Sequence, residues 1–357
     1  MKSVHWRYLL KVHLKTLIAV LSVVALIIFI FTFTETLRRM AGRATISLEF
    51  LSLIALYRLP YIMVVLFPYI YLVSVSLALE ALASSRQLTV LRAGGYSMRQ
   101  ILSPFLWLAG VLSLTWFFIF QPFAARLYNE IQLKEQQHFG ISSHSGTNLW
   151  LYQRSPAEPS ILLHVARMQN NVCVDVSVYL FSEDGTLKEK IFARTLHFAP
   201  GAWILSHGTA FKKEGLEYQS FSERKIENTL DADRMLSSLT PPEDLGVYDL
   251  FSIVKVRKKN HLYEKEHILA LHALGAKAVL IFLMVFVAGC FQKKHSRGKK
   301  SVSVAQTLLC GLFLHFFMDI FHSLGIKGVL APFWAGWTSV LLTGAFSFAC
   351  LSWKEER

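Results

Sequence analysis

The sequence predicts a membrane α-helical fold of six spanning helices, arranged three and three, with an all-β domain inserted between the two triplets. Long apolar runs account for the helices, and only 17% of the residues are charged, against about 25% in an average soluble domain. The region 122–266 instead contains short runs of β-branched and aromatic residues separated by turn signals. We therefore expect two membrane parts, 1–121 and 267–357, around a β domain at 122–266.

Six apolar runs are each long enough to cross a hydrocarbon core, which takes about 20 helical residues. They are Val12–Phe33, Leu59–Leu79, Ile101–Ala125, Ile268–Phe291, Val302–Ile326 and Val329–Trp353. A cleaved signal peptide is the alternative for the first run. That run is too long for a signal peptide, and no small-residue cleavage site follows it.

The short loops predict the orientation. With the N-terminus inside the cell, fourteen basic residues lie in the inner segments and five in the outer short segments, which satisfies the positive-inside rule. Both termini are then cytoplasmic and the β region lies outside, in the periplasm if the cell has an outer membrane. The net charge of +13 lies mostly at membrane edges, so anionic lipid explains it better than nucleic acid does.

Six strands are expected in the β region, with a hairpin at Asp184-Gly185 and turns at Pro200-Gly201 and Gly215. The expected strands are Asn148–Gln153, Ile161–Met168, Cys173–Phe181, Lys188–Phe198, Ala202–Ser206 and Leu216–Phe221. Such a pattern suggests a sandwich or a jelly-roll. Of the four cysteines only Cys173 lies here, so no disulfide framework supports the domain. A passive cap outside the membrane is the alternative to a working domain.

The loop between spans two and three predicts a short helix at 84–93. Ser84 and Gln87 fit a capping box, and Gly94-Gly95 supplies a helix stop. This helix is either a connector at the membrane surface or a coupling helix that docks into a cytoplasmic motor.

No catalytic set is present. Gly298-Lys299-Lys300-Ser301 lacks the earlier glycine of a nucleotide-binding loop, and neither H-E-x-x-H nor G-x-S-x-G occurs. The cluster His261, Glu264, Glu266 and His267 is more typical of a solvated helix start than of a metal site. We expect no enzyme, no catalytic residue, no metal and no cofactor. Any energy must come from another subunit.

Two charges interrupt the later apolar runs, Lys277 in the fourth and Asp319 in the fifth. A charge at mid-bilayer costs roughly 2.5–3.5 kcal/mol on insertion scales, so each should face protein or a wet cavity. Mutual neutralisation is the simplest interpretation, and substrate or proton handling is the alternative.

Basic residues also gather at the outer membrane edge, where the positive-inside rule does not place them. Arg38, Arg39 and Arg43 follow span one beside Glu35, and Arg126 follows span three. Guanidinium groups bind phosphate in a bidentate manner, so a lipid phosphate site is possible. Ordinary headgroup anchoring is the alternative.

Taken together, three spans, a β domain and three further spans resemble the permease subunits of the lipopolysaccharide exporter, the LptF/LptG family, with a pattern closer to the G-type. The resemblance covers essentially the whole chain. Its more specific parts are Phe-Thr-Glu-Thr-Leu-Arg-Arg at 33–39, Ala-Ser-Ser-Arg-Gln-Leu-Thr-Val-Leu-Arg-Ala-Gly-Gly at 83–95, Leu-Thr-Pro-Pro-Glu-Asp-Leu at 239–245, and Lys277.

This resemblance implies that the chain extracts lipopolysaccharide from the inner membrane and passes it into a periplasmic bridge. The implied partners are a cytoplasmic ATPase dimer (LptB-like), a second permease (LptF-like), and a bridge protein with a membrane-anchored adaptor (LptA/LptC-like). Lipid would enter between spans one and five of opposing subunits. Its phosphates would meet Arg38, Arg39, Arg43 and Arg126, and the ATPase would receive Ser84, Arg86, Gln87, Leu88, Leu91 and Arg92.

The chain departs from the family at two points. Gln87 stands where the family usually has Glu, which weakens an expected ion pair with the ATPase or transfers it to a residue such as Glu80. The proline common soon after Lys277 is absent. Two rival functions stay open: a permease for another lipid or a lipoprotein, and a scaffold that does not transport.

Overall fold

The computed structural model describes residues 2–40, 47–139, 149–153, 160–169, 172–182, 186–199, 202–212, 218–227, 241–259, 265–292 and 301–356. The chain divides into two compact units. One is helical and comprises Met1–Ile131 and Ile268–Arg357; the other is mostly β-structure and comprises Gln132–His267.

The helical unit contains six helices long and apolar enough to cross a membrane, within the described part of the chain. The six predicted spans are therefore confirmed. The helices are α1 (Lys2–Met40), α2 (Leu48–Ser84), α3 (Gln87–Ala93), α4 (Met98–Thr115), the π-helical turn η1 (Trp116–Phe120), α5 (Gln121–Phe139), α8 (Lys265–Phe291), α9 (Ser301–Ile326) and α10 (Pro332–Glu356).

The third span is one long helical stretch in which α4 passes through η1 into α5. Its apolar run ends at Ala125, but helix continues to Phe139 because the polar residues that follow are good helix formers. The boundary between the two units accordingly falls at residue 132, not at 122. Apolar composition marks where lipid contact ends, which is not where the helix ends.

Proline shapes the contact between the second and third spans. Pro68 lies inside α2 and has no N–H to bond the carbonyl of Val64 one turn earlier. Nε1 of Trp116 in η1 donates to that oxygen at 3.0 Å. The indole is 1% exposed, so a carbonyl freed inside the bundle has a partner, as a water-free environment requires.

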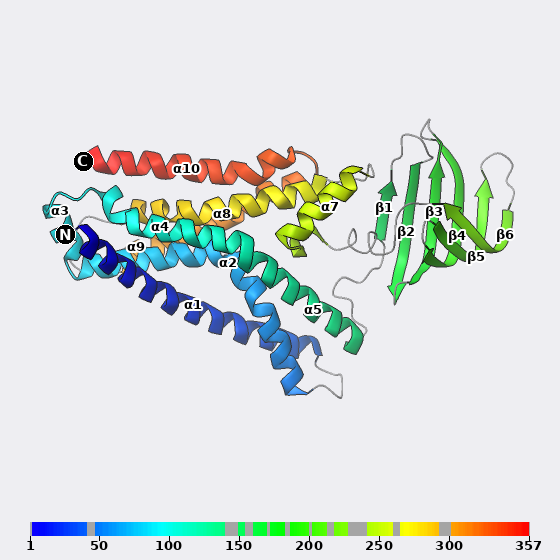
Figure 1. The fold of residues 1–357 in the computed structure, drawn as a ribbon, viewed down its shortest axis with the longest axis horizontal. Coiled ribbons are helices and arrows are strands. Elements are labelled where there is room, and N and C mark those ends of the chain that lie inside the picture. The colour runs from blue at the N-terminus through cyan, green and yellow to red at the C-terminus, as the bar shows by residue number, and fades with distance from the viewer. Residues whose placement is uncertain are drawn as a thin grey trace. The chain divides into compact units, whose positions relative to one another are not determined.

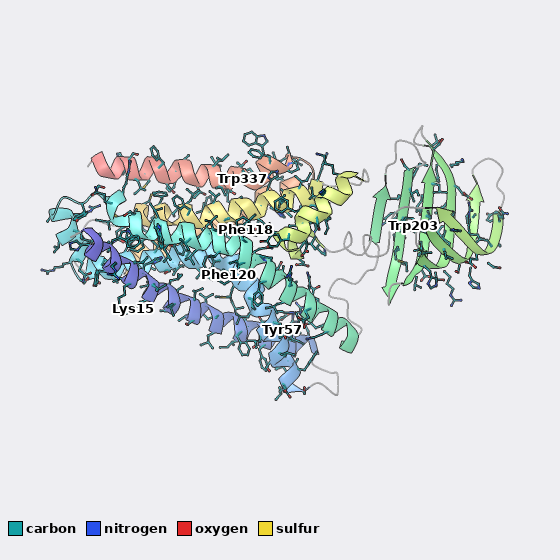
Figure 2. The ribbon with its side chains drawn as sticks, in the orientation of Figure 1. Lys15, Tyr57, Phe118, Phe120, Trp203 and Trp337 are labelled. Carbon is teal, nitrogen blue, oxygen red and sulfur yellow. The ribbon has the colours of Figure 1, made fainter. Side chains whose placement is uncertain are left out.

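Close contacts also hold the C-terminal helices. Ser113 Oγ donates to the carbonyl of Ala278 at 2.6 Å, which ties α4 to α8. Trp337 of α10, labelled in Figure 2, donates through Nε1 to Nδ1 of His272 in α8 at 3.3 Å. A side chain at Gly336 of α10 would lie 2.9 Å from Cβ of His272, so this glycine lets the two helices approach.

The N-terminus, the C-terminus and α3 lie at the same end of the helical unit (Figure 1). This agrees with an even number of spans and with a loop that joins spans two and three on the side of both termini. The arrangement gives α3 the position that a partner on the side of the termini would need.

The second unit contains a six-stranded antiparallel sheet of order β1-β2-β3-β4-β5-β6. All six expected strands are present, although β5 and β6 run further than predicted. Their bounds are β1 Leu149–Gln153, β2 Ser160–Gln169, β3 Val172–Phe181, β4 Leu187–Ala199, β5 Ala202–Lys212 and β6 Tyr218–Glu227. Every described strand pairs with its neighbours in sequence, so these residues form a meander without the crossover of a Greek key. The expected sandwich or jelly-roll topology is not seen among them.

The sheet bends along a line through Asp175 and His207, which we call the crease, and this bend explains why strand alternation predicted β5 too short. Asp175 and His207 adopt left-handed backbone angles, with φ of 55° and 54°, and both are left out of the strand register. The inward-facing positions change phase there, from Leu205 to Ala210 in β5. A side chain at Gly208 would lie 2.3 Å from a backbone oxygen, so only glycine fits this close approach.

Both halves of the creased sheet contribute to one apolar core. Trp203, labelled in Figure 2, is fully buried there with Leu163 and Leu205. The predicted hairpin tip at Asp184-Gly185, the Pro200-Gly201 turn and Gly215 lie outside the described residues. Beside that tip, the N–H of Ser182 donates to the carbonyl of Thr186 at 2.8 Å. After the sheet come the 3-10 turn η2 (Pro242–Asp244) and helix α7 (Val247–Lys259).

Candidate functional site

The two arginines that end α1 share one carboxylate. Arg38 donates from Nε and Nη2 to the two oxygens of Glu35, at 2.9 and 3.0 Å. Arg39 donates from Nε to the same carboxylate at 2.8 Å. The three residues occupy positions i, i+3 and i+4, which face each other on a helix.

Glu35 fixes both guanidinium groups but neutralises only one of them, so the cluster keeps one net positive charge. The side chains of Arg38 and Arg39 remain 75% and 56% exposed. Arg126 of α5 is exposed as well, with no ion pair among the described residues. Arg43 lies outside them. The structure thus brings together two of the four predicted phosphate ligands.

The predicted helix between spans two and three exists, but its start was predicted wrongly. Ser84 is the last residue of α2, and its Oγ donates back to the carbonyl of Ala81 at 3.0 Å. Arg86 is the N-cap of α3, with a left-handed φ of 58° and no side-chain capping bond. The capping box in this loop is formed by Ser97 and Gln100 at the start of α4. Ser84 cannot cap α3 because α2 continues through it.

The two faces of α3 differ sharply. Leu88 is 7% exposed and belongs to the core of the helical unit, and Leu91 packs against the same core. The outward face carries Arg86, Thr89 and Val90, and Val90 is 69% exposed. Leu88 and Leu91 therefore hold α3 on the bundle. Val90 was missed, although the three-residue spacing of the two leucines already places it on the opposite face.

The other predicted coupling residues have intermediate positions. Gln87 and Arg92 are partly buried, and Ser84 is exposed. Oε1 of Gln87 is buried and has no hydrogen-bond partner in the described part of the chain. A glutamate at this position would bury a charge there, whereas the neutral amide of this chain costs less to bury.

Lys277 and Asp319 do not neutralise each other among the described residues. Lys277 is partly buried in α8, between the buried residues Ala276 and Ala278. Asp319 Oδ2 lies 3.7 Å from Nε2 of His315 one turn earlier in α9, and its side chain is 65% exposed. The predicted pairing of Lys277 with Asp319 is therefore not seen among the described residues.

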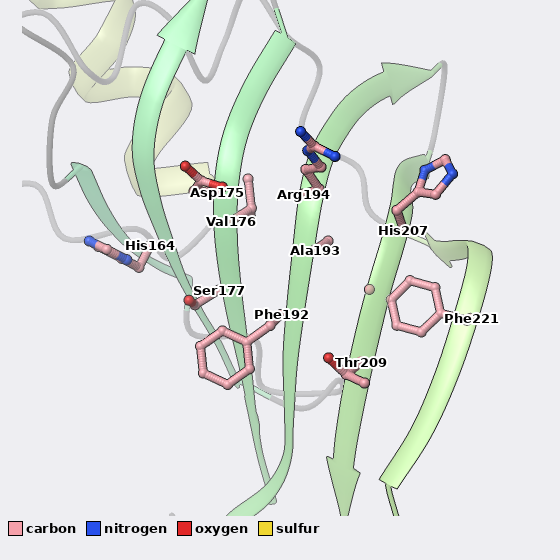
Figure 3. Close-up of a pocket in the computed structure, with 11 residues that line it drawn as sticks. His164, Asp175, Val176, Ser177, Phe192, Ala193, Arg194, His207, Thr209 and Phe221 are labelled. Carbon is pink, nitrogen blue, oxygen red and sulfur yellow. The ribbon is translucent and has the colours of Figure 1, made fainter.

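The β unit has a filled interior and a polar pocket. Its inward-facing apolar side chains pack on one another, and several have no exposure at all. A shallow pocket of about 500 Å³ lies at the crease. Figure 3 shows Asp175, Arg194 and His207 in one row across three neighbouring strands, with Phe192 and Thr209 beside them. Over the described ranges, no three His, Cys, Asp or Glu residues are grouped to hold a metal ion.

Residues 7–353 match a family of proteins described as "Lipopolysaccharide export system permease LptF/LptG". No curated protein matches the chain. The match covers both membrane halves and the β unit between them. With six helices that can cross a membrane, this makes the chain a multi-pass membrane protein and a transport subunit, not an ATPase. The chain belongs to the LptF/LptG family of lipopolysaccharide export system permeases.

Proposed function

We propose that this chain extracts lipopolysaccharide from a bacterial inner membrane and passes it through its β unit to a periplasmic bridge. Both termini and α3 are cytoplasmic, the β unit is periplasmic, and the chain acts as the G-type partner of a second permease. A cytoplasmic ATPase dimer supplies the energy, and a membrane-anchored adaptor joins the bridge. The two membrane halves are 1–131 and 268–357, and the β unit lies between them at 132–267.

The braced arginine pair at the end of α1 carries this proposal. Glu35 orders Arg38 and Arg39 while their outer N–H groups stay exposed. An ordered guanidinium loses little entropy when it binds an oxyanion in a bidentate manner. Such a pair at headgroup depth suits the phosphate groups of lipopolysaccharide, and Arg43 and Arg126 would add charge nearby.

The apolar part of the lipid sets the energy requirement. Exposing one acyl chain of twelve carbons to water costs about 10 kcal/mol at 0.8 kcal/mol per methylene group. Several such chains exceed what one loop rearrangement can offset. A covered apolar route and an external motor are therefore both needed, with α3 as the contact to the motor.

The β unit supplies that route in this proposal. Its core side chains, Trp203 and Leu205 among them, are fully buried, so the unit contains no open channel for an acyl chain at these residues. An acyl chain would enter by separating core side chains and packing between them. Leu180, Phe221 and Ile226 pack at the margin of this core and are only partly buried. They are where an acyl chain would first enter.

A site-specific photo-crosslinker at Arg39 tests the proposal in native membranes that contain the partner subunits. We expect capture of lipopolysaccharide that decreases when ATP is added. The control is the same probe at Lys15, an exposed residue on α1 (Figure 2) that lies 24 positions earlier. It should capture mainly phospholipid.

Two results would contradict the proposal. Capture of only phospholipid or lipoprotein at residue 39 would favour a permease for another cargo. Purification of the chain without any ATPase after gentle solubilisation would favour a scaffold that does not transport.

A further inference from the structure

The face of the β sheet that points away from its core carries exposed aromatic side chains. In the strand register, Trp150, His164, Ser177 and Phe192 lie in one row across β1 to β4. The residues on either side of the last three are buried in the core, so this row lies on the opposite, outer face. Trp150 is 56% exposed. Large aromatic side chains that face water instead of a core indicate a binding surface.

A second outer row extends this surface. It comprises Tyr179, Lys190, Phe211 and Tyr218, paired across β3 to β6. The ring of Trp150 stacks on that of Tyr179, with centroids 6.2 Å apart. Nζ of Lys190 lies 5.0 Å from the ring centroid of Tyr179 and 4.4 Å from that of Phe192. The two rows therefore form one ordered aromatic surface with an ammonium group on it.

Three polar side chains lie beside this surface at the crease. Arg194 stands between Asp175 and His207 in a row across β3, β4 and β5 (Figure 3), and all three residues are exposed. Left-handed backbone angles at Asp175 and His207 take both out of the strand register. Within the described ranges, neither Asp175 nor Arg194 forms an ion pair. Their charged groups are therefore available to a ligand in the pocket of about 500 Å³ that they line.

A sugar that carries negative charge fits this combination of groups. The C–H face of a sugar ring packs on an aromatic ring, while its hydroxyl groups bond to carboxylate, guanidinium and imidazole groups. Lys190, Arg194 and Asp175 together carry one net positive charge, which favours a sugar bearing phosphate or carboxylate. In lipopolysaccharide the sugar hydroxyls cannot enter an apolar core without losing hydrogen bonds. The acyl part and the sugar part therefore need opposite faces of the sheet.

We propose that the outer face of the sheet, from the row of Trp150 to the crease, binds the anionic saccharide of lipopolysaccharide. This assignment rests on the proposed function and names where the sugar part of the cargo is held. A protein partner fits this face less well. A strand of another protein pairs at a sheet edge, here β1 or β6, and the centre of a protein interface is depleted of residues such as Lys190 and Asp175.

The test uses the complete chain in nanodiscs and lipopolysaccharide from which all acyl chains have been removed. Calorimetric titration should show saturable binding of this saccharide, and the neutral oligosaccharide maltohexaose should not reproduce it. Arg194→Gln and Trp150→Leu should each raise the dissociation constant at least fivefold without changing the melting temperature, because both side chains are exposed. Lys255→Gln, at an exposed position of α7 outside the sheet, is the control and should leave the dissociation constant unchanged.

Four results would overturn the inference. They are the absence of saturable binding, wild-type affinity in both variants, equal binding of an oligogalacturonate (an acidic saccharide unrelated to lipopolysaccharide), and crosslinking of residue 150 to another protein in native membranes. The crosslinker at Arg39 separates this inference from the proposed function. If residue 39 captures lipopolysaccharide but the saccharide does not bind, only this inference fails. If residue 39 captures none, the proposed function itself fails.

Discussion

Val90 offers the most direct test of α3 as the contact to a motor. The residue is 69% exposed on the outward face of a helix that Leu88 anchors. Fully burying a valine side chain contributes about 1.5–3 kcal/mol. About two-thirds of that gain is still available, so docking at Val90 should contribute about 1–2 kcal/mol.

Val90→Ala should therefore weaken binding of the ATPase several-fold, and up to about 30-fold if the whole contribution is lost. Val90→Asp should weaken it more, since a carboxylate must be stripped of water in the interface. The measurement is the dissociation constant of the purified ATPase for the membrane-embedded complex, together with ATP hydrolysis by that complex. Neither substitution should change the melting temperature, because the side chain contacts little of its own chain.

Two variants complete the design. Val329→Asp, at a position 68% exposed between α9 and α10, is the matched control and should leave ATPase binding unchanged. Leu88→Ala should instead lower the melting temperature, because truncating a buried leucine costs about 2–5 kcal/mol. ATPase binding that is unaffected by Val90→Asp in a normally folded chain would refute the assignment of this face.

Three further predictions concern the fold. Gly208→Ala should prevent the crease from forming, because the added carbon would lie 2.3 Å from a backbone oxygen; limited proteolysis of the purified chain should then cleave the β unit, and resistance equal to wild type would contradict this. Trp116→Phe leaves the Val64 carbonyl without its donor and should lower the free energy of unfolding by about 0.6–2 kcal/mol. The measurement is the melting temperature in detergent, which should fall. The control Trp107→Phe, at a 55% exposed site, should have little effect on it. Burial raises the pKa of the Cys173 thiol to about 12 from 9.0, so the native domain should lose stability as pH rises from 9 towards 12, and Cys173→Ala should reduce this loss; identical pH profiles would refute it.

The sequence was most informative where one physical property dominates. Apolar length predicted all six spans, and alternation located all six strands, because water exclusion acts on each segment separately. Boundaries were less accurate. The third span continues to Phe139 because helix formation does not stop where hydrophobicity does.

The errors at the candidate sites arose where contacts with neighbouring residues determine the local structure. Ser84 has the right spacing for a capping box with Gln87, but α2 continues through Ser84 and takes its hydroxyl. Nothing local in the sequence distinguishes a serine that caps the next helix from one that ends the previous helix. The register of α3 depends on packing against the bundle, which a single sequence does not show.

By itself, then, the sequence determined the membrane class of this protein, the order of spans and strands, and the presence of unusual charges at Arg38, Arg39, Lys277 and Asp319. Only the tertiary structure decided what those charges face. It placed Glu35 between two arginines, turned Leu88 inward and Val90 outward, and left Asp319 open on an apolar face. The physical reason is that hydrophobicity is a property of each segment, whereas electrostatic and packing partners are set by residues far apart in the chain.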